Sequence, residues 1–308
     1  MESLQFRAMN TEISIAAEGS LQKLAPGFEK ARQFIVDSER RFTRFSEDSE
    51  LSQLNRSAGT WFRASTDLLT VILLARHYVE QTAGLFDPAI LPDLQRVGYD
   101  RSMDLIRAQG VFSLPQPASR RHLAFDGVVI NPQESLVCLP EGMSIDLGGI
   151  AKGWIAEQAA LILADYSAVC GVSAGGDMYL SGIPENLSGW PVALDDPRHP
   201  GRTLVTLNLP PGAIATSSVA KRAWKQGGKD RHHLIDPRTG EPAETEWLSV
   251  TVIAEHVDLC EVFAKALLIA GPLEAQALAQ SNEITYLAVD HEGNLLGTKK
   301  SLEYLNDR

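Results

Sequence analysis

The sequence predicts an α+β protein with mixed, largely antiparallel sheets and helices packed against them. The first reason is that strand-like and helix-like segments are interspersed without the regular βαβ alternation of a parallel sheet. The second is a series of short strand-like segments between residues 191 and 254, separated by turns. The third is a hairpin signal, in which Asn131 and Pro132 join two apolar segments.

Length and composition set the scale of the molecule. The chain has 308 residues, of which 44% are hydrophobic, so it can bury a sizeable core. We expect a single domain over residues 1–308, or two closely packed subdomains. The formal net charge of -11 argues against a nucleic-acid partner, because phosphate binding requires clustered Lys and Arg.

The first part of the chain predicts a strand and two long helices. Alternating isoleucines indicate a strand over 9–17, and apolar residues at helical spacing indicate a helix over 26–42, with a proline in its first turn. A polar turn at 46–55 resembles a helix start, and a second helix is expected from about Ser65 to a C-cap at Gly84. The residues expected on its buried face are Leu68, Leu69, Ile72, Leu73 and Val79.

The rest of the chain is richer in expected strands. Residues 114–119 read as a loop, and residues 122–130 and 134–140 as a hairpin. Two further helices are expected, one after Gly153 and one over 257–270. The first of them should bury Trp154, Ile155, Leu161 and Ile162. The expected strands are 191–196, 203–209, 213–217, 248–254, 284–290 and 294–305.

Three cysteines, Cys138, Cys170 and Cys260, lie far apart without a CxxC pair, which suggests reduced and buried thiols.

The first residues contain no basic segment followed by an apolar one, so they do not resemble a secretory signal. No apolar run approaches the length of a membrane span. We therefore expect a cytoplasmic protein without a transmembrane segment.

The segment DLGGIAKGW at 146–154 is the first candidate for chemistry. Its two glycines let the backbone pass close to a ligand, and the N–H groups at the following helix start suit an anion. Lys152 falls in the first helical turn, where a cation is poorly placed for the helix dipole. A bound diphosphate would explain that placement, although a surface lysine after a tight turn is the simpler alternative.

Two other segments carry an acidic residue in a tight turn. In GLFDPAI at 84–90, Asp87 precedes a proline and is held extended, although a helix-ending turn explains the same pattern. In HHLIDPRTG at 232–240, the residues around Asp236 predict a β-turn. Neighbouring strand residues face opposite sides, so His232 and His233 are not expected to bind one ion together.

These three segments, in this order, with MNTE at 9–12 and SAGGD at 173–177, resemble the ApbE family of FAD:protein FMN transferases. The resemblance extends from about Met9 to Gly271. It implies that FAD binds at these segments and that Gly149 offers a backbone carbonyl to a metal ion. Phe45 stands where many members carry Tyr, so the ring is kept and the hydroxyl is lost. The flavin contacts that it implies are Met9, Phe45, Leu85, Phe86, Asp87, Asp146, Lys152, His233 and either Leu234 or Ile235.

The sequence departs from the family pattern in the helix expected over 257–270. The family presents an Asp and, four residues later, a Thr that bind Mg²⁺, and these positions are Glu261 and Lys265 here. A lysine competes with Mg²⁺, which requires oxygen ligands. Asp258 and Glu261 could hold a shifted Mg²⁺, or Lys265 could replace the charge of the metal. A solvent-exposed helix face with a Glu261–Lys265 ion pair is the third alternative.

The resemblance implies an enzyme that cleaves FAD at its diphosphate, transfers FMN to a Thr or Ser hydroxyl of an acceptor flavoprotein and releases AMP. Charge neutralisation and positioning dominate such a phosphoryl transfer. Asp258 or Glu261 would accept the proton of the hydroxyl group. Two alternatives remain open at this point: an FAD-binding protein that has weakened or lost the transfer, and an FAD diphosphatase that produces FMN and AMP.

Overall fold

The computed structural model describes residues 1–109 and 123–305, and the chain divides into two compact units. The loop expected at 114–119 lies outside the described residues. The first unit comprises Met1–Ser38, Lys152–Ala220 and Thr245–Arg308, and the second comprises Glu39–Ala151 and Lys221–Glu244. Each unit is thus assembled from segments that are distant in the sequence.

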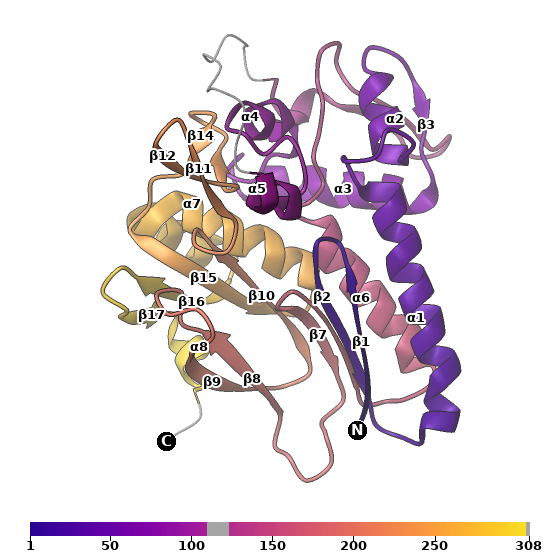
Figure 1. Ribbon diagram of the computed structural model, residues 1–308, viewed down its shortest axis with the longest axis vertical. Coiled ribbons are helices and arrows are strands. Elements are labelled where there is room, and N and C mark those ends of the chain that lie inside the picture. Colours follow the sequence, from indigo (N-terminus) through magenta and orange to yellow (C-terminus); the bar gives the residue numbers. More distant parts are fainter. Residues whose placement is uncertain (110–122, 306–308) are drawn as a thin grey trace. The chain divides into compact units, whose positions relative to one another are not determined.

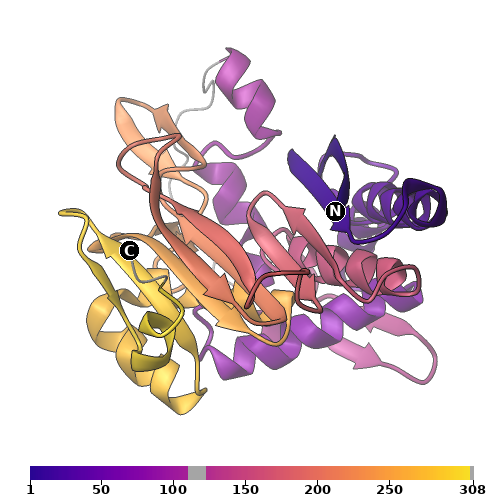
Figure 2. The ribbon, with the colours of Figure 1, turned by 90° about the horizontal axis from the view of Figure 1, so that it is seen from below.

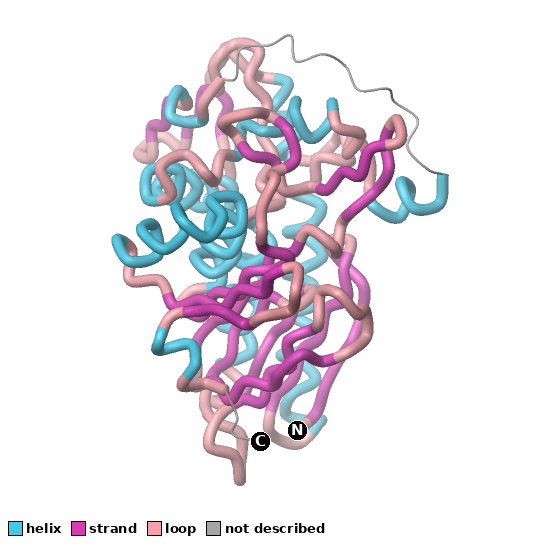
Figure 3. Tube along the Cα trace, turned by 90° about the vertical axis from the view of Figure 1, so that its left-hand side faces the viewer, coloured by secondary structure: helices cyan, strands magenta, loops and turns pink. Residues whose placement is uncertain are grey.

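An eight-stranded sheet forms the centre of the first unit, and its strands lie side by side in Figure 3. Every neighbouring pair in it is antiparallel, which confirms the predicted α+β class. Its strands, in spatial order, are β1 (Glu2–Ala8), β2 (Thr11–Ala17), β6 (Cys170–Ala174), β7 (Asp177–Ser181), β10 (Gly212–Ser218), β15 (Trp247–Ala254), β16 (Thr285–Asp290) and β17 (Leu295–Gly297).

A separate hairpin of β8 (Trp190–Asp195) and β9 (Thr203–Leu209) packs on this sheet. Residues along β8 alternate between buried and exposed, so one face of the hairpin is apolar. Ile214 and Ile253 are opposite one another in the sheet and belong to the same apolar cluster as the hairpin. The other buried members of the cluster are Leu180, Trp190, Val192, Leu194, Leu207, Leu209 and Leu287.

Helices complete the first unit. Helix α7 (Val257–Ser281) packs along β10 and β15, as Figure 1 shows. Helix α6 (Ala151–Ala164) lies beside α1 (Leu21–Phe42), and the rings of Phe34 and Trp154 meet with centroids 6.0 Å apart. The β1–β2 hairpin lies next to α1 in both Figure 1 and Figure 2. The short helix α8 (Lys299–Leu302) follows β17.

The second unit holds shorter elements around its own core. An apolar cluster joins α4 (Leu91–Arg96), α5 (Met103–Gln109) and the loop between them to Trp224 and Ile235, which come from the distant segment 221–244. Trp224 donates its indole N–H to the carbonyl of Val97 at 2.9 Å, which fixes that segment. The helices are α2 (Glu50–Arg56), α3 (Thr66–Gln81), η1 (Pro88–Ile90), α4 (Leu91–Arg96), α5 (Met103–Gln109) and η2 (Phe125–Gly127). The strands are β3 (Phe62–Arg63), β4 (Val129–Asn131), β5 (Leu136–Cys138), β11 (Ala223–Gln226), β12 (Lys229–His232), β13 (Ile235–Asp236) and β14 (Glu241–Pro242).

The N-terminal elements differ from the sequence prediction. Met9 is not a strand residue: with Asn10 it forms the two-residue turn between β1 and β2, and both have positive φ (53° and 55°). That geometry matches the right-handed twist of a hairpin. Helix α1 begins at Leu21, so Pro26 lies inside the helix and not in its first turn.

Two expected core residues are exposed, two are only half-buried, and two expected element boundaries are wrong. Leu73 and Leu161 are exposed, because the helical period places them outside the buried stripes of α3 and α6. Val79 and Ile162 are half-buried. The helix expected over 257–270 continues as α7 to Ser281, across a break at Gly271 (φ 70°, ψ 175°). Residues 294–305, expected as one strand, form β17 and then α8.

Helix α7 is the one helix among the described residues that reaches a membrane span in length and composition. The expectation that no segment approaches such a span is therefore too strong by this measure. Its residues up to Ile269 are mostly buried in the first unit, and its backbone leaves the helical region before Pro272. These are the features of a kinked core helix.

The thiols follow the prediction more closely. Cys138, Cys170 and Cys260 are all free, and the last two are buried. Burial raises the pKa of the Cys170 thiol to about 11. It also raises the pKa of Cys260 well above its ordinary value, so neither group is activated as a nucleophile.

The starts of α6 and α7 approach one another closely at Gly153. A Cβ atom added at Gly153 would lie 2.8 Å from the carbonyl oxygen of Val257 and 3.1 Å from the nitrogen of Asp258. We expect Gly153→Ala to lower the free energy of unfolding by about 1–3 kcal/mol, because neither backbone can yield easily. Urea denaturation measures this change. The control Gln158→Ala, in the same helix, should change stability by no more than about 0.5 kcal/mol, and equal effects would show that the close approach is unimportant.

Candidate active site

A buried ion-pair cluster stands at the start of α6. The ammonium group of Lys152 pairs with the carboxylate of Asp177 and lies 3.4 Å from Oε1 of Glu261. Asp177 is 3% exposed, Glu261 is 5% exposed, and the side chain of Lys152 is 15% exposed. Each carboxylate is thus shielded from water and faces the same cation. Replacing that lysine by an uncharged residue would leave buried charges without a partner and would destabilise the fold.

Asp177 is fixed by the strands on which it lies. It begins β7 directly after the glycines of SAGGD, Gly175 and Gly176, whose φ angles are 66° and 102°. The other carboxylate oxygen, Oδ1, accepts the backbone N–H of Thr216 in β10 at 3.2 Å. SAGGD is therefore a turn at a strand end, and it directs a carboxylate toward Lys152.

Glu261 and Glu157 cap each other's helices. Oε2 of Glu261, in α7, accepts the N–H of Gly153 in the first turn of α6 at 2.8 Å. Oε2 of Glu157, in α6, accepts the N–H of Val257 at the first position of α7 at 2.8 Å. Each carboxylate satisfies an N–H that has no partner within its own helix and lies at the positive end of the helix dipole.

This exchange corrects one alternative: the helix face with Glu261 is not exposed to solvent, since Glu261 is buried. At the start of α6, Glu261 binds the Gly153 N–H, and Lys152 pairs with two carboxylates of the protein. The contact of Lys152 with the diphosphate of FAD remains a prediction.

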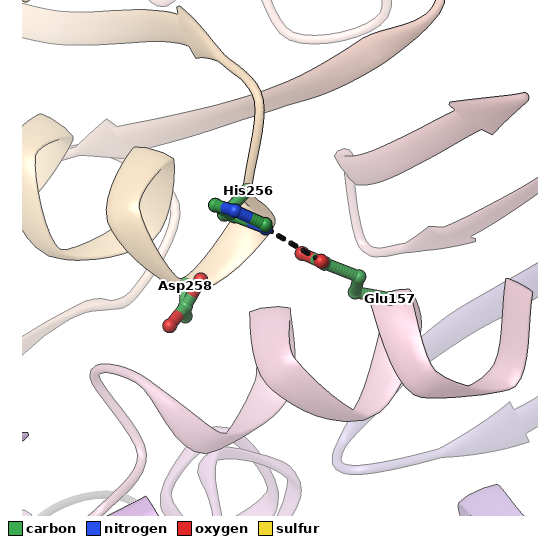
Figure 4. A group of neighbouring side chains, drawn as sticks. All are labelled: Glu157, His256 and Asp258. Carbon is green, nitrogen blue, oxygen red and sulfur yellow. Dashed lines mark hydrogen bonds and ion pairs between the residues drawn. The ribbon is translucent and has the colours of Figure 1, made fainter. Parts of the chain in front are cut away.

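Figure 4 shows that His256 and Asp258 lie beside Glu157. The His256 Nδ1 atom is 2.8 Å from Oε1 of Glu157, and ligand atoms of all three residues lie within 4.8 Å of one another. The hydrogen bond to Glu157, together with the charges of Glu157, Asp258 and Glu255, raises the pKa of His256. These three residues thus lie at the N-terminus of α7, where Glu157 accepts the N–H of Val257.

In the second unit, Asp146 is held by an arginine that sequence reasoning missed. Oδ2 of Asp146 lies 2.5 Å from Nε of Arg44, and Oδ1 accepts the N–H of Gly148 at 2.6 Å. The Arg44 guanidinium lies over the rings of Phe45 and Tyr99, 4.3 and 4.6 Å from their centroids. The available signal was the position of Arg44 directly before Phe45. These contacts orient two of the residues expected to bind flavin.

The GLFDPAI segment has a clear structural role. Asp87 accepts the N–H of Ala89 at 2.7 Å and the N–H of Phe125 at 3.3 Å, so its carboxylate caps η1 and anchors η2. Leu85 and Phe86 are buried. The turn reading of this segment is therefore correct. Contacts of these residues with flavin remain a prediction.

The HHLIDPRTG segment comprises the end of β12, strand β13 and the turn that leads to β14. Its Asp236 carboxylate binds the guanidinium of Arg238 at 2.9 Å. Both ring nitrogens of His232 are engaged, with the Ala243 carbonyl at 3.1 Å and the Leu234 N–H at 3.3 Å, and burial lowers the pKa of this histidine. His232 thus ends β12 and joins it to Ala243, the residue after β14. His233 is half-buried and Leu234 is buried, and their flavin contacts also remain predictions.

The Glu261–Lys265 helix does not fit a magnesium site. Both oxygens of Glu261 are engaged, one by the Lys152 ammonium and the other by the Gly153 N–H. Lys265 stands at the second ligand position and offers a cation where Mg²⁺ requires an oxygen. Asp258 lies with Glu157 and His256, not with Glu261, among the potential ligand groups of the described residues. A shifted Mg²⁺ between Asp258 and Glu261 would have to compete with the Gly153 and Lys152 contacts of Glu261.

Residues 9–288 match the model of the ApbE family, and the chain belongs to that family. A curated relative from Vibrio cholerae serotype O1, an FAD:protein FMN transferase, is 28% identical over 256 residues, covering 80% of this chain and 73% of that protein. The Haemophilus influenzae protein of the same name is 25% identical and covers 89% of this chain and 81% of its own length.

Solved structures share the fold over nearly the whole chain. The ApbE protein of Thermotoga maritima superimposes with a TM-score of 0.89 at 23% identity, covering 99% of both chains. The flavin transferase ApbE of Vibrio cholerae gives a TM-score of 0.79 at 22% identity, also covering 99% of both chains. At these identities the likeness establishes the fold and not the chemistry.

The first prediction from the site concerns Lys152. Lys152→Met should lower the free energy of unfolding by roughly 3 kcal/mol, because it leaves two buried carboxylates facing each other without their shared cation. The double variant with Asp177→Asn should recover part of this loss. Urea denaturation checks both. Lys225→Met, which removes an exposed lysine, serves as the control, and a similar loss in that variant would contradict the assignment.

The second prediction concerns pH. The folded-state pKa of His256 is raised above its unfolded value of about 6.5. Its stabilisation is therefore fully present below that value and is lost as the pH rises through the higher folded-state pKa. The destabilisation caused by His256→Asn should be larger below about pH 6 than above about pH 8. Thermal unfolding at several pH values tests this. His291→Asn is the control, and parallel pH curves for wild type and His256→Asn would contradict the prediction.

Proposed function

We propose that the protein transfers FMN from FAD to a Thr or Ser hydroxyl of an acceptor flavoprotein and releases AMP. Family membership and the curated relatives named FAD:protein FMN transferase support this proposal. The observation that carries it is the buried cluster of Lys152, Asp177 and Glu261, because Lys152 and Asp177 belong to two of the segments that carry the resemblance.

The proposed reaction is a phosphoryl transfer. The hydroxyl oxygen of the acceptor forms a bond to the phosphorus of the FMN half of FAD. The bond from that phosphorus to the bridging oxygen breaks, and the bridging oxygen leaves with AMP. The hydroxyl proton passes to a carboxylate. Catalysis then depends on holding the diphosphate and neutralising its charge.

We assign the proton acceptor to Asp258 and not to Glu261. Glu261 already accepts the N–H of Gly153 and faces Lys152, so its negative charge is used to hold the start of α6. Asp258 lies one turn earlier on α7 and is buried beside Glu157 and His256. Asp258 lies in the first turn of α7, where the helix dipole favours the ionised carboxylate, which is the form that can accept a proton.

A second candidate is an FAD-binding protein or FAD diphosphatase with weakened or lost transfer. The observation that favours it is Lys265, which stands where the family presents an oxygen ligand for Mg²⁺. For either candidate we propose a cytoplasmic location, since two of the three free cysteines are buried thiols without a disulfide.

The experiment is incubation of the full chain with FAD and a recombinant flavoprotein domain that carries a Thr flavinylation site. We expect AMP and protein-bound flavin in equal amounts. Asp258→Asn should lower the rate roughly a hundredfold or more, whereas the exposed Glu303→Gln should not change it. Nucleotide chromatography and flavin fluorescence of the denatured acceptor are the measurements.

The products separate the candidates. AMP with free FMN and no flavin on the acceptor would identify a diphosphatase. Tight FAD binding without any AMP would identify a binding protein. Either result would contradict the transferase proposal.

A further inference from the structure

The charge arrangement on α7 differs from that of a divalent-metal site. Glu261 is one methylene longer than the Asp of the family pattern, and its carboxylate reaches the Gly153 N–H at 2.8 Å. Lys265 follows four residues later in the same helix, which places it on the same face as Glu261. It is half-buried. This face of α7 therefore carries a carboxylate that is already held and an ammonium group beside it.

The carboxylates of Asp177 and Glu261 already share a cation of the protein. Lys152 lies between the two carboxylates. A divalent cation bound to Glu261 would have to displace Lys152 or approach it without screening by water, and the repulsion of like charges is strong in a buried setting.

The ligand preference of Mg²⁺ makes the displacement of Lys152 by this ion still less favourable. Mg²⁺ requires oxygen ligands in near-octahedral geometry at close range. A Thr hydroxyl is such a ligand, whereas an ammonium group has no lone pair to offer. Lys265 is a cation itself and can bind a phosphate oxygen directly, as a point charge with hydrogen-bond donors.

We propose that Lys152 and Lys265 supply the positive charge at this site, so that the protein binds the diphosphate of FAD without a divalent cation. The inference rests on the proposed function, because it concerns FAD as the ligand. It assigns Lys265 as a specificity-determining residue: the side chain favours a metal-free diphosphate over a diphosphate that carries Mg²⁺.

The test compares FAD binding by the full chain in EDTA and in millimolar MgCl₂. Flavin fluorescence measures the dissociation constant in each buffer. For wild type we expect the same dissociation constant in both, within about twofold. The double variant Glu261→Asp/Lys265→Thr should bind FAD about tenfold more weakly in EDTA, and MgCl₂ should restore the affinity. Lys299→Thr/Glu303→Asp alters an exposed lysine of α8 and the exposed glutamate directly after that helix, with the same spacing, and should behave as wild type.

Calorimetric titration of Mg²⁺ into the FAD complex provides a second measurement. Wild type should give no saturable binding, and the double variant should give saturable binding. If the double variant does not fold, Lys265→Met keeps the length of the side chain and removes its charge. It should bind FAD about tenfold more weakly, with no recovery in MgCl₂.

The outcomes distinguish this inference from the function on which it rests. Wild-type affinity that falls about tenfold in EDTA and returns with MgCl₂ would overturn the inference and leave the function intact. Unchanged affinity in Lys265→Met would also overturn it, since it shows that Lys265 does not meet the diphosphate. Absence of FAD binding in both EDTA and MgCl₂ would overturn the proposed function and the inference together.

Discussion

The reciprocal capping of α6 and α7 is the constraint on which the first unit depends. Gly153 lets the two helix starts meet backbone to backbone, which brings two positive dipole ends together. Glu157 and Glu261 offset this repulsion, each accepting an N–H from the other helix. The carboxylates are buried, and ionised groups there require partners. Lys152 is the partner of Glu261, and His256 is the partner of Glu157.

The same arrangement holds Lys152, the residue proposed to bind a phosphate group, in a fixed position. Asp177 reaches Lys152 from a tight glycine turn between β6 and β7, and the β10 backbone fixes its second oxygen. A buried ion pair of this kind contributes little net stability, but the loss of one partner is costly. The cluster therefore keeps Lys152 in one place. A lysine held at a fixed position can meet a phosphate group with little further loss of side-chain entropy.

In the second unit, acidic residues of the characteristic segments likewise stabilise the turns in which they lie. Asp87, Asp146 and Asp236 all accept local backbone or guanidinium N–H groups, so each of the three acidic residues in the characteristic segments holds its own loop. Arg44 extends this role, since it joins Asp146 to the rings of Phe45 and Tyr99. In a protein that binds flavin, such contacts would prepare the loops before the ligand arrives, which lowers the entropic cost of binding.

The sequence by itself determined the fold class, most strands and helices, and the three segments that define the family, because periodicity, turn residues and motif spacing are local properties. The turn at Met9 and the exposure of Leu161 were missed because strand pairing and helix packing decide them. Sequence also identified Glu261 and Lys265 as a departure from the family pattern. Only the tertiary structure showed that Glu261 caps α6 and binds Lys152, since 108 residues separate Glu261 from Gly153 along the chain. Contacts over such separations leave no periodic signal in the sequence, so the partner of a buried charge is decided by the folded chain.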